Sequence, residues 1–317
     1  MRSRWNDREG KQAASDPLAA RVYTSRLLGQ EPALALHGGG NTSVKGQVTN
    51  RFGDVDEVLY VKGSGWDLAT IEPAGFSPVK LDVAKRLASL EALSDPDMVA
   101  ILRTAMLDPN APNPSVETIL HAIVPFRYVD HTHADAVVAI TNTAHGFQRV
   151  RELYGRRVLV VPYVMPGFLL AKRVYAMTRS LRWDQLDGIV LAHHGLFTFG
   201  DEAKTSYEAM IRLVSIAERY VKRQGAARSL RRPRRRHEPL QTEAALKQLA
   251  RLRRAVSVSA QAPMLAIWDN DPESKAFASL PNVSSIASRG PLTPDHVIRT
   301  KRIPVILGAR IEQDMVR

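Results

Sequence analysis

The sequence predicts an α/β fold in which helices flank a central mixed or antiparallel sheet. Apolar runs typical of strands alternate along the chain with segments of helical periodicity, without the strict strand–helix–strand repetition of a parallel sheet. The 317 residues are 44% hydrophobic, which is enough apolar material for a large packed core.

In the first part of the chain, two helical segments enclose a strand and two glycine-rich loops. Apolar residues at roughly helical spacing predict the helices, and β-branched residues predict the strand. Glycines clustered with polar residues indicate loops. The predicted elements are a helix at 17–30, a glycine-rich segment at 37–46, a strand at 58–61 that ends in the loop 63–65, and a helix at 79–92.

The rest of the chain continues the alternation. Ser115 is expected to be the N-cap of a short helix, because its hydroxyl can accept a hydrogen bond from the first turn. The predicted elements are a helix at 115–124, strands at 128–138 and 157–164, a helix near 169–180, a strand at 188–200, helices at 202–221 and 242–254, and short apolar runs at 264–268 and 303–307, the second of which is strand-like.

A strongly basic tract follows the long helix. Residues 222–236 hold eight Lys and Arg residues and no acidic residue, and without these eight the formal net charge falls from +12 to +4. We expect a solvated, flexible connector. The alternative is a contact with RNA, DNA or an acidic protein, but the tract contains no aromatic side chain on which the bases of a single strand could stack. The predicted domains are 1–225, a basic linker at 226–240 and a C-terminal extension at 241–317.

Composition excludes several kinds of site. The chain contains no cysteine, so it holds no disulfide, thiolate metal site or cysteine nucleophile, and a metal would need imidazole, carboxylate or water ligands. No run of about 18 apolar residues occurs, and the N-terminus lacks the apolar centre of a secretion signal. We therefore expect a cytoplasmic protein that does not associate with membranes.

Two pairs of histidines and one glutamate are the candidate metal-site residues. His131 and His133 lie two apart on a predicted strand, so their side chains project to the same side. Catalytic zinc usually takes three protein ligands, and one of His193 and His194 could supply the third. Either pair could instead be ordinary polar residues on a strand. Glu117 could likewise be a favourable charge at a helix start, or a general base or fourth ligand beside a metal.

The glycine-rich loops are candidates for binding a phosphate. Glycines let backbone N–H groups approach an anion, although such clusters are more often simple turns. Neither loop matches a P-loop or a dinucleotide-binding fingerprint. Polar and cationic side chains suited to a phosphate monoester lie within or near them: Asn41, Lys45, Lys62, Ser64 and Ser115.

Five motifs in a fixed order resemble those of the class II aldolase/adducin family. They are GGGNTS, KGSG, PSVE, HTHAD and HHGL, spread over about residues 20–220. More narrowly, the early Trp5-Asn6-Asp7 and the late RGPLTPDHVIRTKRIPVILG at 289–308 are similar to the aldolase half of bifunctional rhamnulose-1-phosphate aldolase/short-chain dehydrogenase proteins. In those proteins a dehydrogenase domain follows, so a separate dehydrogenase is an expected partner.

The resemblance implies a class II aldolase-like, three-layer α/β/α fold and assigns roles to individual residues. It implies zinc, or another divalent metal, at His131, His133 and His194, with Glu117 as the catalytic acid/base. Positions that contact phosphate in the family correspond to Gly40, Asn41, Ser64, Gly65 and Ser115. Val116 replaces a hydroxyl residue of well-studied members, and neither Tyr154 nor Tyr163 can be matched to the tyrosine that protonates the aldehyde in some of them.

The resemblance also implies an activity. We expect a zinc-dependent aldolase in which the metal acts as a Lewis acid on a (deoxy)ketose 1-phosphate, such as L-rhamnulose 1-phosphate, giving dihydroxyacetone phosphate and lactaldehyde. The family suggests a homotetramer. The alternatives are a sugar-phosphate epimerase or decarboxylase that uses the same metal site, and a non-catalytic, adducin-like scaffold protein.

Overall fold

A computed structural model describes residues 1–225, 243–268, 271–297 and 299–307. The chain divides into two compact units. One comprises Met1–Val221 together with Leu292–Arg299, and the other comprises Lys222–Pro291 together with Thr300–Arg317. The predicted linker 226–240 and most of the basic tract lie outside the described residues, so the sequence-based domain boundaries stay predictions.

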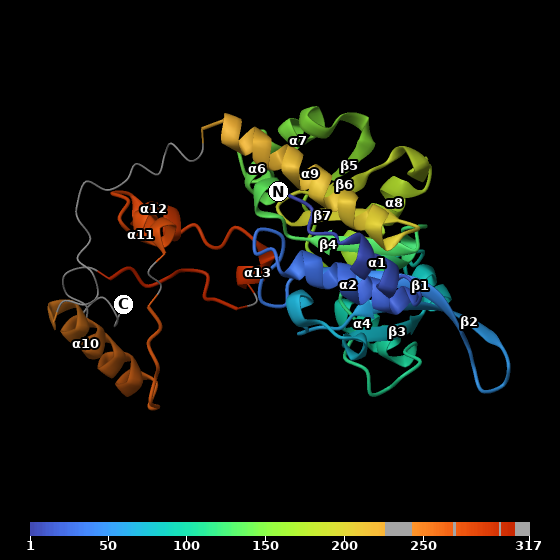
Figure 1. Ribbon diagram of the computed structural model, residues 1–317, viewed down its shortest axis with the longest axis horizontal. Coiled ribbons are helices and arrows are strands. Elements are labelled where there is room, and N and C mark those ends of the chain that lie inside the picture. The colour runs from blue at the N-terminus through green and yellow to red at the C-terminus, as the bar shows by residue number, and fades with distance from the viewer. Residues whose placement is uncertain (226–242, 269–270, 298, 308–317) are drawn as a thin grey trace. The chain divides into compact units, whose positions relative to one another are not determined.

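Within the described residues, seven strands of the first unit form one mixed sheet in the order β3-β2-β1-β4-β7-β6-β5 (Figure 1). Only β5 and β6 pair in parallel, and the other neighbours are antiparallel. The strands are β1 Asn41–Thr49, β2 Val55–Lys62, β3 Phe76–Lys80, β4 Tyr128–Thr132, β5 Val158–Val161, β6 Gly188–Leu191 and β7 Gly195–Gly200. The predicted mixed sheet is therefore confirmed.

Helices cover both faces of this sheet. The helices of the first unit are α1 Asp7–Ala13, α2 Pro17–Gly29, α3 Leu81–Leu87, α4 Asp95–Thr104, α5 Thr118–Ile123, α6 Asp135–Thr141, α7 Gly146–Tyr154, α8 Phe168–Thr178, α9 Ala203–Arg223 and α13 Pro294–Val297. The second unit contains α10 Glu243–Ser259, α11 Pro272–Ala278 and α12 Val283–Ala287. Among the described residues, no helix is both long and apolar enough to cross a membrane.

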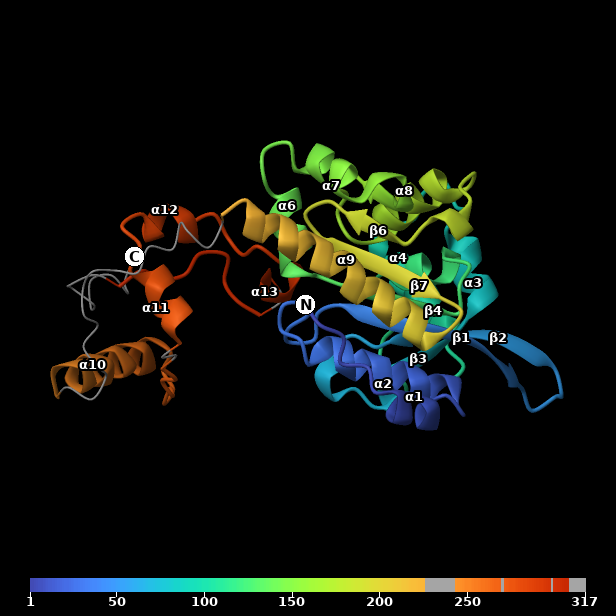
Figure 2. The same ribbon diagram turned by 45° about the horizontal axis from the view of Figure 1, so that its top comes forward.

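Two hydrophobic cores lie on opposite faces of the sheet. Alternate residues of a strand point to opposite faces, and in β7 Phe197 packs with α3, α4, α5 and α8 while Leu196 packs with α2, α6, α7 and α9. In β6, Ile189 packs in the same core as Phe197, and Val190 packs in the same core as Leu196. The long helix α9 runs along the second face (Figure 2). This arrangement is the expected three-layer α/β/α fold.

Several predicted boundaries were wrong, each for a local reason. The helix expected at 79–92 begins only at Leu81, because Phe76–Lys80 pairs with β2 as a short strand at the sheet edge. The strand expected at 128–138 ends at Thr132, and its apolar second half forms α6. Ser115 does not cap α5, whose first residue is Thr118.

The strand expected at 188–200 is a hairpin, β6 and β7, joined by a turn in which His193 has a left-handed backbone with φ 59°. Periodicity could not detect this break, since the residues on both sides are apolar. The strand-like run at 303–307 forms no strand.

A fully buried ion pair joins α2 to the central strand β4. The guanidinium of Arg21 pairs with the carboxylate of Asp130, and neither side chain is exposed. Arg21 also donates to Thr24 Oγ1 at 2.6 Å and Ser25 Oγ at 3.2 Å, and Ser206 Oγ donates to Asp130. A buried charge is costly without such partners.

Removing one member of this pair should therefore be strongly destabilising. We expect Arg21→Met to lower the free energy of unfolding by about 3–5 kcal/mol, because it leaves the Asp130 carboxylate buried without its cation. The double variant R21M/D130N should recover part of this loss, since no charge remains. Chemical denaturation followed by circular dichroism measures both values. Arg182→Ala, which removes an exposed ion pair with Asp184, is the control and should change the free energy of unfolding only slightly. An effect of Arg21→Met as small as that of the control would contradict the expectation.

Candidate metal centre

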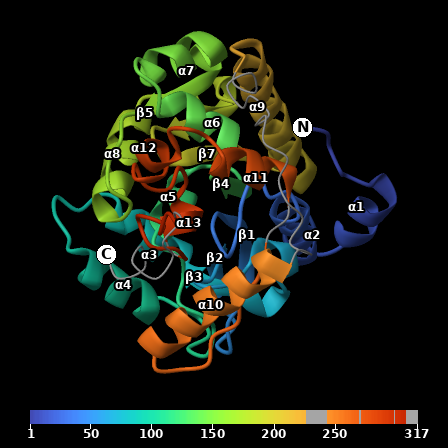
Figure 3. The same ribbon diagram turned by 90° about the vertical axis from the view of Figure 1, so that its left-hand side faces the viewer.

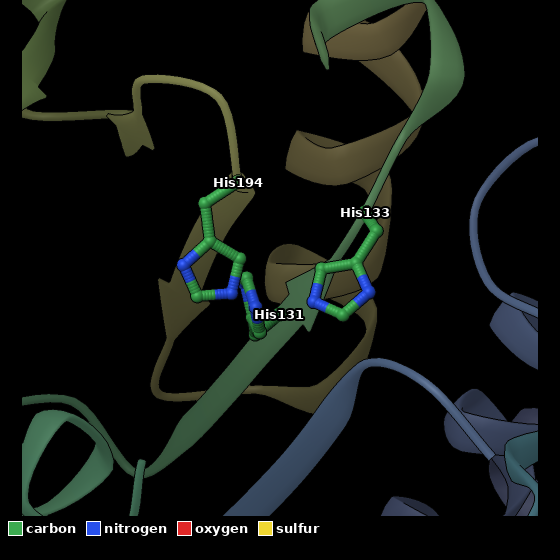
Figure 4. Close-up of side chains that lie close together, drawn as sticks. All are labelled: His131, His133 and His194. Carbon is green, nitrogen blue, oxygen red and sulfur yellow. The ribbon is translucent and has the colours of Figure 1, made fainter. Parts of the chain in front are cut away.

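Three buried histidines converge at the sheet (Figure 4). One ring nitrogen from each lies within 4.8 Å of those of the other two. His131 lies on β4, His133 follows the end of the same strand, and His194 lies in the turn between β6 and β7. This is the ligand type and number that a divalent metal such as zinc requires.

The β6–β7 turn determines which of the adjacent histidines joins the cluster. His193 donates its backbone N–H to Thr141 Oγ1 at 3.0 Å, and its ring lies 2.9 Å from Asn142 Oδ1, so it faces α6. His194 faces His131 and His133 instead (Figure 4). Gly195 lets the start of β7 lie close to the end of β4, because a Cβ at position 195 would overlap the carbonyl oxygen of Thr132.

Burial keeps two of the imidazoles in the form that binds metal. Desolvation, reinforced by the neighbouring imidazoles, holds the pKa of His131 well below its ordinary value. Desolvation also lowers the pKa of His194, against the opposing effect of the Glu117 carboxylate. His131 Nδ1 donates to the Leu196 carbonyl at 3.2 Å, so the lone pair of this neutral ring is on Nε2.

Glu117 lies against the histidines with very little exposure, 4%. Its Oε2 is 3.3 Å from His131 Nε2, and its Oε1 is 3.4 Å from His194 Nε2. Within the described structure, Glu117 Oε1, His131 Nε2 and His194 Nδ1 are buried without a hydrogen-bond partner. Glu117 Oε1 and His131 Nε2, unpaired and next to each other in a cluster of three imidazoles, are the donors that a cation would satisfy, so these residues fit a divalent metal.

A buried hydrogen-bond chain fixes the orientation of Glu117. Asn41 Nδ2 donates to Glu117 Oε2 at 2.7 Å, which leaves Asn41 Oδ1 to accept from His121 Nε2. Burial holds the pKa of His121 well below its ordinary value, so its neutral ring has Nδ1 free to accept from Ser43 Oγ at 2.8 Å. The sequence places Glu117 and His121 four apart, but it did not indicate this role for His121.

The glycine-rich loops adjoin the same site. Gly40 has φ 61°, and a Cβ there would crowd the His131 carbonyl, so glycine is required. Ser115 Oγ accepts from Asn41 Nδ2 at 3.2 Å, which links the first loop to the segment before α5. Ser64, exposed beside Gly65, donates its backbone N–H to the Asn113 carbonyl at 2.8 Å. All five candidate phosphate positions therefore lie on adjoining segments.

The two candidate lysines differ. Lys62 Nζ donates to the Gly38 carbonyl at 2.8 Å, and burial lowers its pKa to about 8. Lys45 Nζ instead donates to the carbonyls of His121, in α5, and of Phe126, at 2.9 and 2.7 Å. Of these two lysines, only Lys62 directs its ammonium group to a glycine of the loops.

The two tyrosines considered as proton donors have different surroundings. Tyr154 is in the hydrophobic core and donates to the Leu213 carbonyl at 2.9 Å. Tyr163 is half exposed, and its ring lies edge-on to that of His193, with centroids 5.9 Å apart.

Comparisons with known proteins agree with this geometry. The sequence model of the class II aldolase and adducin N-terminal domain matches residues 19–221, and that of the aldolase class II second domain matches residues 243–316. A solved N-terminal class II aldolase domain of a conserved protein from Thermoplasma acidophilum is 41% identical, with a TM-score of 0.64, and the match covers 70% of this chain and 99% of that one.

A curated relative is considerably longer than this chain. The protein named uncharacterized oxidoreductase YuxG, from Bacillus subtilis (strain 168), is 34% identical over 288 residues. The match covers 90% of this chain but only 41% of the relative, so the chain spans about two fifths of that protein's length.

The two adjacent histidines provide a matched test of the metal centre. We expect His194→Ala to weaken zinc binding by about 100-fold or more, because loss of a direct ligand should exceed the 10–100-fold effect of an outer-shell partner. His193→Ala, one residue away and facing α6, should leave the affinity within about twofold. Competition titration against a chromophoric chelator measures both, and equal effects of the two variants would exclude this cluster as the metal site.

Proposed function

The chain belongs to the class II aldolase/adducin family, and we propose that it is a metal-dependent aldolase that cleaves a ketose 1-phosphate. The proposed substrates include deoxy sugars such as L-rhamnulose 1-phosphate, which would give dihydroxyacetone phosphate and lactaldehyde. The observation that carries the proposal is the buried carboxylate of Glu117, 3.3 Å from His131 and 3.4 Å from His194 within a cluster of three histidines.

The proposed metal ligands are His131, His133 and His194, and zinc is the proposed ion, because three imidazoles that leave a position open for substrate are typical of catalytic zinc. A divalent cation held there would supply Lewis-acid stabilisation of the negative charge that develops on the substrate oxygens. The buried Nε2 of His131, which has no hydrogen-bond partner and lies beside the Glu117 carboxylate, supports this assignment.

We propose that the adjoining loops bind the substrate phosphate. The residues assigned to this role are Gly40, Asn41, Ser64, Gly65 and Ser115. Support comes from the left-handed glycines at 40 and 65, with φ 61° and 88°, which turn the backbone where a side chain would be strained. Binding energy from a phosphate held here would orient the reacting carbons, which lie away from the anchor.

The proposed reaction is a retro-aldol cleavage. The C4 hydroxyl loses its proton and becomes the aldehyde carbonyl, while the electron pair of the C3–C4 bond passes to C3 and forms an enediolate. A proton added to C3 then gives dihydroxyacetone phosphate, so atoms and electrons balance without a redox cofactor.

Glu117 is the proposed carrier of the proton at C3. Asn41 holds its Oε2, whereas Oε1 has no hydrogen-bond partner and can exchange a proton with substrate.

We further propose that the protein forms a homo-oligomer, with the four subunits expected from the family resemblance. A separate dehydrogenase is the proposed partner. An epimerase or a decarboxylase could use the same histidines and glutamate, and product analysis distinguishes these reactions: only an aldolase yields dihydroxyacetone phosphate and an aldehyde.

Replacing Glu117 tests the proposal. We expect Glu117→Gln to lower kcat for cleavage about 10²–10⁴-fold, because the amide cannot carry the proton, while bound zinc is retained. The exposed Glu91→Gln is the matched control and should be as active as the original protein. A coupled assay for dihydroxyacetone phosphate on rhamnulose and fuculose 1-phosphates gives kcat, and metal analysis gives the zinc content.

Removing the metal provides the second half of this test. Exhaustive chelation should abolish cleavage, and added zinc should restore it. Full cleavage after chelation, or release of a product other than an aldehyde from every substrate tried, would rule out the proposed activity.

A further inference from the structure

The segment Leu292–Arg299, far along the chain from the histidines, carries a buried carboxylate that contacts the metal centre. Asp295 on α13 is 3% exposed, and its Oδ1 lies 2.6 Å from His133 Nδ1. Its Oδ2 accepts the backbone N–H of Leu36 at 3.0 Å. The segment belongs to the same compact unit as the histidines, and α13 lies beside the loop that precedes β1 (Figures 1 and 3).

We propose that Asp295 is a positioning residue of the metal centre, which orients His133 and directs its Nε2 to the ion. This inference rests on the proposed function, since it assumes that His133 binds a metal. A histidine that donates one ring N–H to a carboxylate has its tautomer and ring orientation fixed, and its other nitrogen becomes a better metal ligand.

The contacts of the carboxylate favour this role over direct ligation. Both oxygens are occupied, one by His133 and the other by the N–H of Leu36. His131 has the corresponding arrangement, because its Nδ1 donates to the Leu196 carbonyl. For His133 the partner is a full negative charge, which makes a stronger hydrogen bond than a carbonyl.

The middle glycine of the HGGG loop is independent evidence for a close approach. Unlike its neighbours Gly38 and Gly40, Gly39 does not have a positive φ, so its backbone conformation does not require glycine. A Cβ at Gly39 would, however, overlap Oδ1 of Asp295. The absence of a side chain at 39 is therefore explained by the carboxylate that must fit beside it.

One further contact anchors the segment without involving the carboxylate, and another lies within the segment. Arg299 Nε donates to the His37 carbonyl at 2.9 Å. Thr293, 2% exposed, lies with its Oγ1 2.8 Å from Nδ1 of His296 within the segment. Docking and metal positioning can therefore be separated by mutation.

Zinc affinity of the full-length protein, stripped of metal and titrated in competition with a chelator, tests the proposal. We expect Asp295→Ala to weaken zinc binding about 10–100-fold, the effect typical of losing such a partner. Asp295→Asn should also weaken zinc binding, because the amide NH₂ is a donor and would face another donor, either the N–H of Leu36 or the Nδ1–H of His133. The Asn variant keeps the shape of the side chain, so it serves if Asp295→Ala fails to fold.

Matched variants separate the carboxylate from simple docking. Arg299→Ala removes an anchor but keeps Asp295, and we expect its zinc affinity to stay within about threefold. The exposed Asp184→Asn controls for charge and should have no effect. Gly39→Ala should weaken zinc binding as much as Asp295→Ala does, because its Cβ would displace the carboxylate. The double variant G39A/D295A should bind zinc about as weakly as Asp295→Ala alone, because no carboxylate remains for the Cβ to overlap.

A spectroscopic readout reports on His133 itself. In the cobalt-substituted protein, the exchangeable Nδ1 proton of a ligating His133 should give a hyperfine-shifted resonance that exchanges slowly with water. Asp295→Ala should lose this slow exchange, whereas Arg299→Ala should keep it. Unchanged zinc affinity in both Asp295 variants, or an equal loss in Arg299→Ala, would overturn the inference.

The outcome also distinguishes this inference from the proposed function. If the original protein binds no divalent metal, the proposed function fails, and the inference fails with it. If it binds zinc and cleaves substrate while the Asp295 variants bind zinc normally, only the inference fails.

Discussion

The candidate site depends on a carboxylate that is buried beside neutral imidazoles. Glu117 is almost fully removed from water, and the nearest ring nitrogens, on His131 and His194, stay uncharged because burial penalises their protonation. Asn41 supplies a hydrogen bond but no charge. Such a cluster gains most from a cation at its centre, and the surrounding structure can be understood as the framework that keeps these groups together.

The central strand β4 is the main part of that framework. Successive residues serve opposite faces of the sheet: Asp130 pairs with Arg21 on α2, and His131 turns toward Glu117. The buried ion pair thus holds the strand from one side, while the next residue contributes to the histidine cluster on the other. Rigid support of this kind suits a site whose ligands must share one ion.

The sequence predicted the parts of the site that lie in short motifs. His131, His133, His194, Glu117 and Asn41 all occur in patterns whose chemistry is local, and the alternation of apolar segments was sufficient for the mixed sheet. The positions where the chain turns, such as the break between β6 and β7, were not predicted, because an apolar run has the same appearance on either side of a turn. His121 and Asp295 were missed for another reason: their partners are distant, and Asp295 lies 162 residues from His133.

That separation has a consequence for how the protein matures. During synthesis the histidines, the glutamate and the sheet that carries them emerge long before residue 295, so a nascent chain can present its three imidazoles while His133 still lacks its carboxylate partner. The contact between His133 and Asp295 can consequently form only after residue 295 has been translated, later than the contacts among the histidines and Glu117.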